Sequence, residues 1–303
     1  MLDYALLEAL AAVIRTGGFD RAARHLNLTP SAISQRVKLL EERMGTALVV
    51  RGQPCTATRA GLRLCQHAEQ VALLESELPG ALPGLDPSAV PVPLRIAVNA
   101  DSLATWFITA MAAPPHCLFD LVLDDQDHSA DWLRRGEVVA AVTAGGGTVP
   151  GCDSHPLGVL RYVATASPDF IDRHFPAGVD AASLSRAPCL TFNAKDGLQA
   201  AWLRRAVGEG GAVPTPPTHW LPSSQAFVDA ALAGIGWGMN PLLLAAPHLA
   251  AGRLVALLPG TELDVPLVWQ RSRLASATLA DLTRAVRRAA GDHLLPFVPS
   301  GSG

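Results

Sequence analysis

One predicted helix near the start of the chain carries two faces of different chemistry. Each helical residue turns the chain by about 100°, so side chains three or four positions apart share a face. The apolar face consists of Ile33, Val37, Leu40 and Met44. The roughly opposite, polar face consists of Ser31, Ser34, Gln35 and Lys38. Short hydrogen-bonding groups with a cation suit phosphates and base edges, whereas the apolar face needs a core.

A shorter helix is expected just before it, over residues 20–26, with a turn at residues 27–29. Two helices joined in this way predict a helix-turn-helix, whose second helix enters the major groove of double-stranded DNA. An ordinary amphipathic helix pair would show the same two faces, so the pattern alone leaves both interpretations open.

The distribution of charge favours DNA. Residues 1–66 contain 9 Lys and Arg against 5 Asp and Glu, whereas residues 67–303 contain 15 against 22. A head of net charge +4 therefore precedes a body of net charge −7, although the whole chain has a net charge of −3. A basic end on an acidic body fits a nucleic-acid contact confined to that end.

The expected DNA contacts follow from position along this segment. Candidates for base edges or groove walls are Ser31, Ser34, Gln35 and Arg36. Candidates for phosphate contacts are Lys38, Arg51, Thr29 and Thr58. Arg51 falls in a two-stranded wing expected over residues 46–58, and Thr58 can also cap the helix that follows.

Length and composition bound the rest of the chain. With 303 residues, 49% hydrophobic and 17% charged, we expect two or three well-filled globular units. The first residues lack a basic region before a long apolar run, and no stretch of about 18 apolar residues occurs. We therefore expect no signal peptide, no membrane span and a cytoplasmic location. The five cysteines are scattered, with no Cys-x-x-Cys pair, which favours free thiols.

A long linker helix is predicted over residues 59–78, and a hinge over residues 79–93 contains five prolines and two glycines. The helix carries a short heptad seam formed by Leu64, His67, Val71, Leu74 and Leu78. The seam would pair two subunits as a homodimer; alternatively, the helix packs on its own domain. Pairing is favoured because one helix-turn-helix offers little contact, and two-fold dimers on palindromes are the usual remedy.

Residues 94–297 alternate predicted strands with helices, among them strands over residues 94–98 and 160–166 and helices over residues 129–135 and 198–207. This alternation favours α/β units with parallel sheets. We expect lobe one over residues 94–164 and 268–297, and lobe two over residues 165–267. Two lobes joined by two crossing segments leave a cleft, a usual place for a small ligand. The predicted fold is an N-terminal all-α winged helix-turn-helix over residues 1–58, a linker helix and a two-lobed α/β effector domain.

With these elements the chain resembles the LysR-type transcriptional regulators, whose effector domain is like a periplasmic binding protein. The motifs that carry the resemblance lie at residues 19–26, 29–41 and 58–61, with Gly45, Leu48 and Arg51. The resemblance implies a DNA-binding regulator and not an enzyme. Such a regulator forms a homodimer or homotetramer and contacts RNA polymerase. Gly18 departs from the serine that often caps the second helix in this family, which leaves that helix start weaker.

A narrower resemblance, to the ArgP/LysG branch of this family, is carried by residues 99–106, 133–139, 175–179 and 223–228. It implies a basic amino acid as the co-effector, L-lysine or L-arginine, and control of genes of amino-acid export or metabolism. It implies no cofactor. The chain departs from the branch at residues 124–127 and 145–147, departures that bear on ligand preference.

The implied ligand offers a carboxylate, an α-ammonium and a distal cation. Carboxylates favour helix starts and hydroxyl groups, and cations favour carboxylates. The matching candidates in the predicted cleft are Asn99, Asp101, Ser102, Asp124, Asp125, Thr143, Asn193, Ser223 and Ser224. Ordinary structural roles compete with ligand binding: Asp101 and Ser223 can each cap a helix, and loop aspartates can be solvated surface residues.

Three other classes of protein fit the sequence less well. An enzyme finds no support, because no G-x-S-x-G, H-E-x-x-H or Walker loop occurs and the nine histidines show no metal-ligand spacing. A solute-binding protein of a transport system fits the effector half but not the basic head. A thiol-based redox regulator would use Cys117, Cys152 or Cys189, and none has sequence neighbours that lower a thiol pKa.

Overall fold

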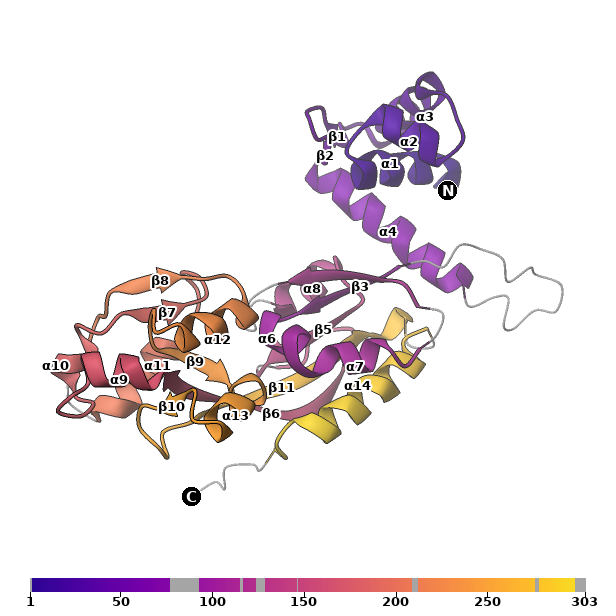
Figure 1. Ribbon diagram of the computed structural model, residues 1–303. Helices are drawn as coiled ribbons and strands as arrows, with labels where there is room; N and C mark the ends of the chain where they lie inside the picture. Colours follow the sequence, from indigo (N-terminus) through magenta and orange to yellow (C-terminus); the bar gives the residue numbers. More distant parts are fainter. Residues whose placement is uncertain are drawn as a thin grey trace. The chain divides into compact units, whose positions relative to one another are not determined.

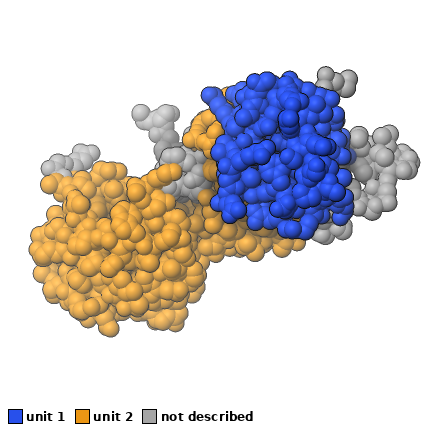
Figure 2. Space-filling model, turned by 90° about the horizontal axis from the view of Figure 1, so that it is seen from above, with its two compact units in different colours: residues 1–92 blue, residues 93–303 orange. Residues whose placement is uncertain are grey.

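The computed structural model describes residues 2–76, 93–114, 117–123, 129–145, 147–208, 212–275 and 278–297. It divides into two compact units, residues 1–92 and 93–303, which Figure 2 shows in blue and orange. Most of the predicted hinge lies outside the described residues.

Unit 1 is built from helices and a small antiparallel wing (Figure 1). Its elements are α1 (Tyr4–Thr16), α2 (Phe19–His25), α3 (Pro30–Met44), β1 (Val49–Val50), β2 (Thr56–Ala57) and α4 (Arg59–Ser76). The helix-turn-helix, the wing and the start of α4 lie where the sequence predicts them, although each wing strand is only two residues long.

The helix ends of unit 1 follow from residue type. Asp3 accepts a hydrogen bond from the Ala5 N–H at the start of α1, and Thr29 accepts one from the Ala32 N–H at the start of α3. Gly45 ends α3 at a φ of 67°, in the left-handed region that glycine adopts without strain. Gly18 begins α2 without a side-chain cap, as its departure from serine predicts.

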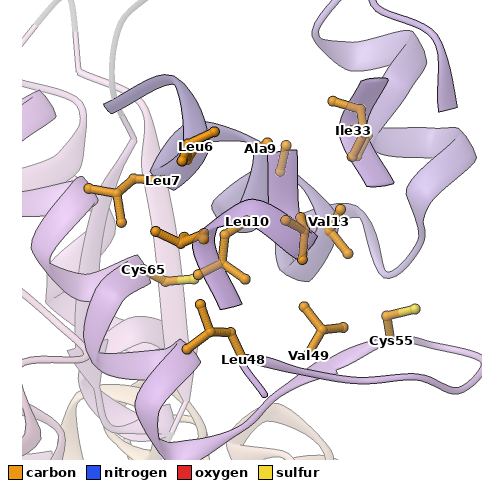
Figure 3. Close-up of a cluster of buried hydrophobic side chains, with 14 of the residues drawn as sticks. Leu6, Leu7, Ala9, Leu10, Val13, Ile33, Leu48, Val49, Cys55 and Cys65 are labelled. Atoms are coloured by element: carbon orange, nitrogen blue, oxygen red, sulfur yellow. The ribbon is translucent and has the colours of Figure 1, made fainter. Parts of the chain in front are cut away.

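The core of unit 1 centres on α1, which packs against α2, α3 and α4. Figure 3 shows side chains of α1 gathered with those of α3, the wing and α4. From α3, Ile33, Val37 and Leu40 enter this core and are at most 2% exposed. Met44, expected on the same face, is 39% exposed because it is the last residue of α3 and extends past the core.

The start of α4 is fixed against the wing. The Thr58 hydroxyl donates to the Ala47 carbonyl at 2.8 Å and accepts from the Gly61 N–H at 3.1 Å. A Cβ at Gly61 would lie 2.0 Å from the Leu48 carbonyl oxygen, so only glycine allows this close approach.

The predicted seam of α4 divides into two parts. Leu64 packs against the core of unit 1, as the alternative of packing on its own domain requires. Leu74, ten residues further along, is 46% exposed. Leu78 lies outside the described residues. Pairing between subunits therefore stays a prediction for the exposed part of α4 alone.

Unit 2 alternates helices and strands over two lobes. Its first elements are β3 (Leu94–Val98), α6 (Ala100–Ser102), the π-helical turn η1 (Leu103–Phe107), α7 (Ile108–Met111), β4 (Phe119–Leu123), α8 (Ser129–Arg135), β5 (Ala140–Ala144) and β6 (Cys152–Ala166). The next are α9 (Pro168–His174), α10 (Ala181–Leu184), β7 (Cys189–Thr191), α11 (Leu198–Val207), β8 (Thr218–Trp220), α12 (Ser224–Leu232), β9 (Gly238–Pro241), α13 (Leu242–Ala250) and β10 (Val255–Ala256). The chain ends with β11 (Leu263–Ser272), η2 (Arg273–Ala275) and α14 (Ala280–His293).

The main sheet has the strand order β10-β6-β11-β5-β3-β4, and β9 pairs with β6. β3 runs parallel to β4 and β5, as the alternation of elements predicts. β11 runs antiparallel to β5 and β6, and β9 antiparallel to β6, so the sheet is mixed and the expectation of parallel sheets holds only in part. β7 and β8 form a separate parallel pair.

The two long strands β6 and β11 join lobe one (β3 to β5 with α14) to lobe two (α9 to β10). In Figure 1 they run from one group of elements into the other. β6 begins at Cys152, eight residues before the expected start at Leu160, because its first half contains His155 and Pro156 rather than an apolar run. The predicted lobe boundaries fall inside these crossing strands.

Buried tryptophans fill both lobes of unit 2. Trp106 of η1 and Trp269 of β11 are fully buried. In lobe one, α14 packs on η1 and α7. Trp202 and Trp237 are fully buried in lobe two, with ring centroids 5.0 Å apart. Such large rings fix the positions of the strand ends and helix starts from which a ligand site is built.

Candidate functional site

The polar face of α3 lies on the surface of unit 1. Ser31, Gln35 and Lys38 are exposed, and Ser34 and Arg36 are half-buried beside them. Lys38 pairs with Glu42 at 3.7 Å, but both side chains are more than 60% exposed, so this ion pair is weak and easily exchanged for a phosphate. The opposite, apolar face holds α3 on α1, which leaves the polar face outward.

Arg51 follows the first wing strand and is exposed. Its guanidinium lies over the Phe19 ring at 5.4 Å from the centroid, a cation–π contact that orients it without using its hydrogen-bond donors. The two threonine candidates have structural partners as well. Thr29 caps α3, and Thr58 joins the wing to α4.

A cavity opens in unit 2 where the two lobes face each other, with about 500 Å³ of empty space including its mouth. Lobe one contributes the turn from β3 into α6, with Asn99, Ala100 and Asp101. Lobe two contributes the segment from β7 to α11, the start of α12 and the strand β9, with Phe192, Asp196, Leu198, Ser224, Phe227, Met239 and Pro241.

Asp101 links the two sides of this cavity. Its Oδ1 accepts from the Ser224 hydroxyl at 2.5 Å, and its Oδ2 accepts from the Tyr162 hydroxyl at 2.7 Å. Tyr162 is fully buried on β6, and burial, followed by the charge of Asp101, raises its pKa well above the usual value. The phenol is therefore a fixed donor to Asp101. Asp101 does not cap its helix, because that role belongs to Asn99.

Asn99 and Ser102 hold unsatisfied polar atoms at the same turn. The Asn99 Oδ1 accepts from the Ser102 N–H at 2.6 Å, which caps α6. The Asn99 side chain is 4% exposed, and its Nδ2 finds no partner among the described residues. The Ser102 hydroxyl is fully buried and also lacks a partner there. Buried donors of this kind normally meet an acceptor, such as water or a ligand.

The structure places the other candidates elsewhere. Ser223 caps α12 by accepting from the Ala226 N–H, whereas its neighbour Ser224 reaches the cavity. The Thr143 hydroxyl pairs with Gln270 and the Asn193 side chain accepts from the Lys195 N–H; neither residue lines the cavity. Asp124 and Asp125 lie outside the described residues.

Two residues at this site, Tyr162 and Asp196, were not predicted from the sequence. Tyr162 lies within β6, where a strand pattern marks it as core, and it pairs with Pro241 of β9 on one side and with Leu263 of β11 on the other. Asp196 lies three residues after Asn193, the residue chosen at this strand end. A carboxylate just before a helix, beside a strand end already expected to line the cleft, is the signal that would have identified it.

The thiols of unit 2 lack the environment of reactive cysteines. Burial raises the pKa of the Cys189 thiol to about 12, and burial also raises the pKa values of Cys117 and Cys152. Thiolates are the reactive form, so these values weigh against redox sensing. The described residues hold no group of three His, Cys, Asp or Glu placed to share a metal ion. None of the described helices has the length and apolar character needed to cross a membrane.

Two family models match the chain along most of its length. Residues 4–62 match the bacterial regulatory helix-turn-helix protein of the lysR family, and residues 93–291 match the LysR substrate binding domain. The first match covers α1 to the start of α4, and the second covers the two lobes and the cavity between them.

Individual relatives are similar over nearly their whole length. The HTH-type transcriptional regulator ArgP of Pseudomonas aeruginosa (strain UCBPP-PA14) is 46% identical over 298 residues, 97% of this chain and 98% of that protein. A crystal structure of ArgP from Mycobacterium tuberculosis matches with a TM-score of 0.82 at 45% identity, covering 98% of this chain and 100% of that one. Full-length LysG from Corynebacterium glutamicum with bound effector Arg matches with a TM-score of 0.70 at 38% identity, covering 97% and 100%.

Proposed function

This chain belongs to the LysR-type transcriptional regulators of the ArgP/LysG kind, and we propose that L-lysine or L-arginine is the effector that controls its binding to DNA. It is a DNA-binding regulator rather than an enzyme. The controlled genes, in this proposal, are genes of amino-acid export or metabolism. The proposal extends to this chain the effector bound in the LysG structure from Corynebacterium glutamicum, which is Arg.

The observation that carries the effector assignment is the position of Asp101. This carboxylate lies at the lobe junction, lines the cavity and accepts from hydroxyl groups of β6 and α12. A ligand ammonium is a stronger donor to a carboxylate than a neutral hydroxyl. The Asn99 Nδ2 beside it supplies a donor for the ligand carboxylate.

On DNA, we assign base contacts to Ser31, Ser34, Gln35 and Arg36, and phosphate contacts to Lys38 and Arg51, with Thr29 and Thr58 as further phosphate contacts. The exposed polar face of α3 and the oriented guanidinium of Arg51 support this assignment. A homodimer, or a dimer of dimers, would double the contact and match a palindromic site. Contact with RNA polymerase belongs to the same proposal.

Ligand control requires that the amino acid bind two states of the protein unequally. The test is to select a bound duplex from random DNA, and then to measure its affinity with and without L-lysine or L-arginine. We expect either amino acid to change the affinity or the footprint, and L-leucine to change neither. Asp101→Ala should abolish the response while DNA binding stays. An unchanged response in that variant would reject the role of Asp101.

A further inference from the structure

We propose that Asp196 recognises the distal cation of the effector and so determines the preference for basic amino acids. This inference rests on the proposed function and deepens it, because it assigns a specificity-determining residue to the cavity. Asp196 lines the same cavity as Asp101 but comes from the other lobe, on the segment between β7 and α11.

A tight turn holds the Asp196 carboxylate in place. Its Oδ2 accepts from the Phe192 N–H and its Oδ1 from the Leu198 N–H, both at 3.0 Å. Its own N–H donates to the Asn193 carbonyl at 3.1 Å. Each carboxylate oxygen has a further acceptor position, so the group can still receive a ligand cation. A carboxylate fixed in this way loses little entropy when a ligand binds.

The other side of the cavity suits the amino-acid head group. Asn99 and Asp101 stand two positions apart on one turn and present an amide donor and a carboxylate acceptor. The α-carboxylate and α-ammonium of an amino acid share one carbon, so they require a donor and an acceptor this close together. The buried Nδ2 of Asn99, which has no hydrogen-bond partner within the described part of the chain, is the independent sign that a ligand group belongs here.

Lobe two also lines this cavity with apolar side chains. Phe192, Leu198, Phe227 and Met239 line the same cavity. These side chains match the methylene groups that separate the two charged ends of lysine or arginine, because apolar surface buried on both partners favours binding. A ligand with its head group at Asp101 and its distal cation at Asp196 would contact both carboxylates and the apolar side chains of the same lining.

The charge of the cavity points to a ligand with two cations. Asp101 and Asp196 are both acidic, and no Lys, Arg or His occurs among the described residues that line the cavity. Burial and the charge of Asp101, followed by that of Asp196, raise the pKa of Tyr162, which places both carboxylates near the same phenol. Two carboxylates in one cavity are stabilised by two cations, which a basic amino acid carries and a neutral one does not.

The test compares each basic amino acid with a neutral counterpart by calorimetry on the full-length protein. L-citrulline matches L-arginine in shape but lacks its charge, and L-norleucine plays this part for L-lysine. The wild type should prefer L-arginine over L-citrulline by roughly tenfold or more, since an unpaired charge in a closed site is costly. In Asp196→Asn this preference should largely disappear.

Asp229→Asn is the matched control, because Asp229 is an exposed acid of α12 outside the cavity. It should keep the wild-type preference. A purely structural role of Asp196 would weaken both ligands alike and leave their ratio unchanged, which would overturn the inference. If Asp196→Asn does not fold, the titrations of the wild-type protein still test the inference. Equal affinity of the wild type for L-arginine and L-citrulline would overturn the inference. Absence of binding by any basic amino acid to the wild type would instead reject the proposed function, and the inference with it.

Discussion

The polar face of α3 and the cavity of unit 2 are both binding surfaces, but the chain assembles them in different ways. The α3 face takes its side chains from eight consecutive positions of one helix, residues 31–38. The cavity takes its side chains from segments spread over residues 99–241. A helix converts sequence spacing directly into a face, whereas separate segments meet only through tertiary packing. The polar face of α3 therefore depends on the core of unit 1, whereas the cavity depends on the junction of the two lobes of unit 2.

The largest expected effect is a loss of stability that is confined to unit 1. Ile33→Ala removes a fully buried side chain that holds α3 on α1. We expect unit 1 to lose about 2–5 kcal/mol of unfolding free energy, because the cavity left behind is only partly refilled. Urea unfolding followed by a probe in unit 1 measures this loss.

Ser31→Ala is the matched control on the exposed face of the same helix, where a substitution changes stability by about 0.5 kcal/mol or less. Binding of L-arginine should be retained in both variants, because the cavity belongs to unit 2. Equal stability of the two variants would show that α3 is not held by its apolar face.

A smaller effect tests base recognition by the α3 face. Gln35 is exposed at the centre of this face, and a glutamine side chain can pair with adenine through two hydrogen bonds. Gln35→Ala should reduce discrimination at one base-pair position by about 1–3 kcal/mol. Selection from random DNA, repeated with the variant, reads this out position by position. The same base preference in variant and wild type would reject the contact.

The smallest effect concerns the wing. Arg51→Ala should weaken all DNA sequences alike and reduce the salt dependence of binding by about one unit of slope, as loss of one phosphate contact requires. Fluorescence anisotropy at several salt concentrations gives that slope. A changed base preference with an unchanged slope would assign Arg51 to base recognition instead.

The same contrast explains what the sequence predicted. The buried and exposed faces of α3, the cap at Thr58 and the uncapped start at Gly18 are local features, and the structure confirms them. Met44 was misplaced because periodicity does not show where the core ends. In unit 2, β3, α8 and α11 have the predicted bounds, since each is an apolar or amphipathic run with clear ends.

The cavity could be predicted only in part. Asn99, Asp101 and Ser224 stand at strand ends or helix starts, positions that sequence pattern locates, and all three line it. Asn193 and Asp196 share one loop, and the backbone path of that turn decides which side chain faces the cavity. Tyr162 depends on the antiparallel pairing of β6 with β9, a long-range contact that alternation of strands and helices does not reveal.

The most direct test of the central claim is a calorimetric titration of the purified protein with L-lysine, L-arginine, L-histidine and L-leucine. We expect saturable binding of L-lysine or L-arginine and no binding of L-leucine, with the binding lost in Asp101→Ala. Absence of binding by the basic amino acids, or equal binding of L-leucine, would contradict the assigned effector and leave only a DNA-binding regulator of this family.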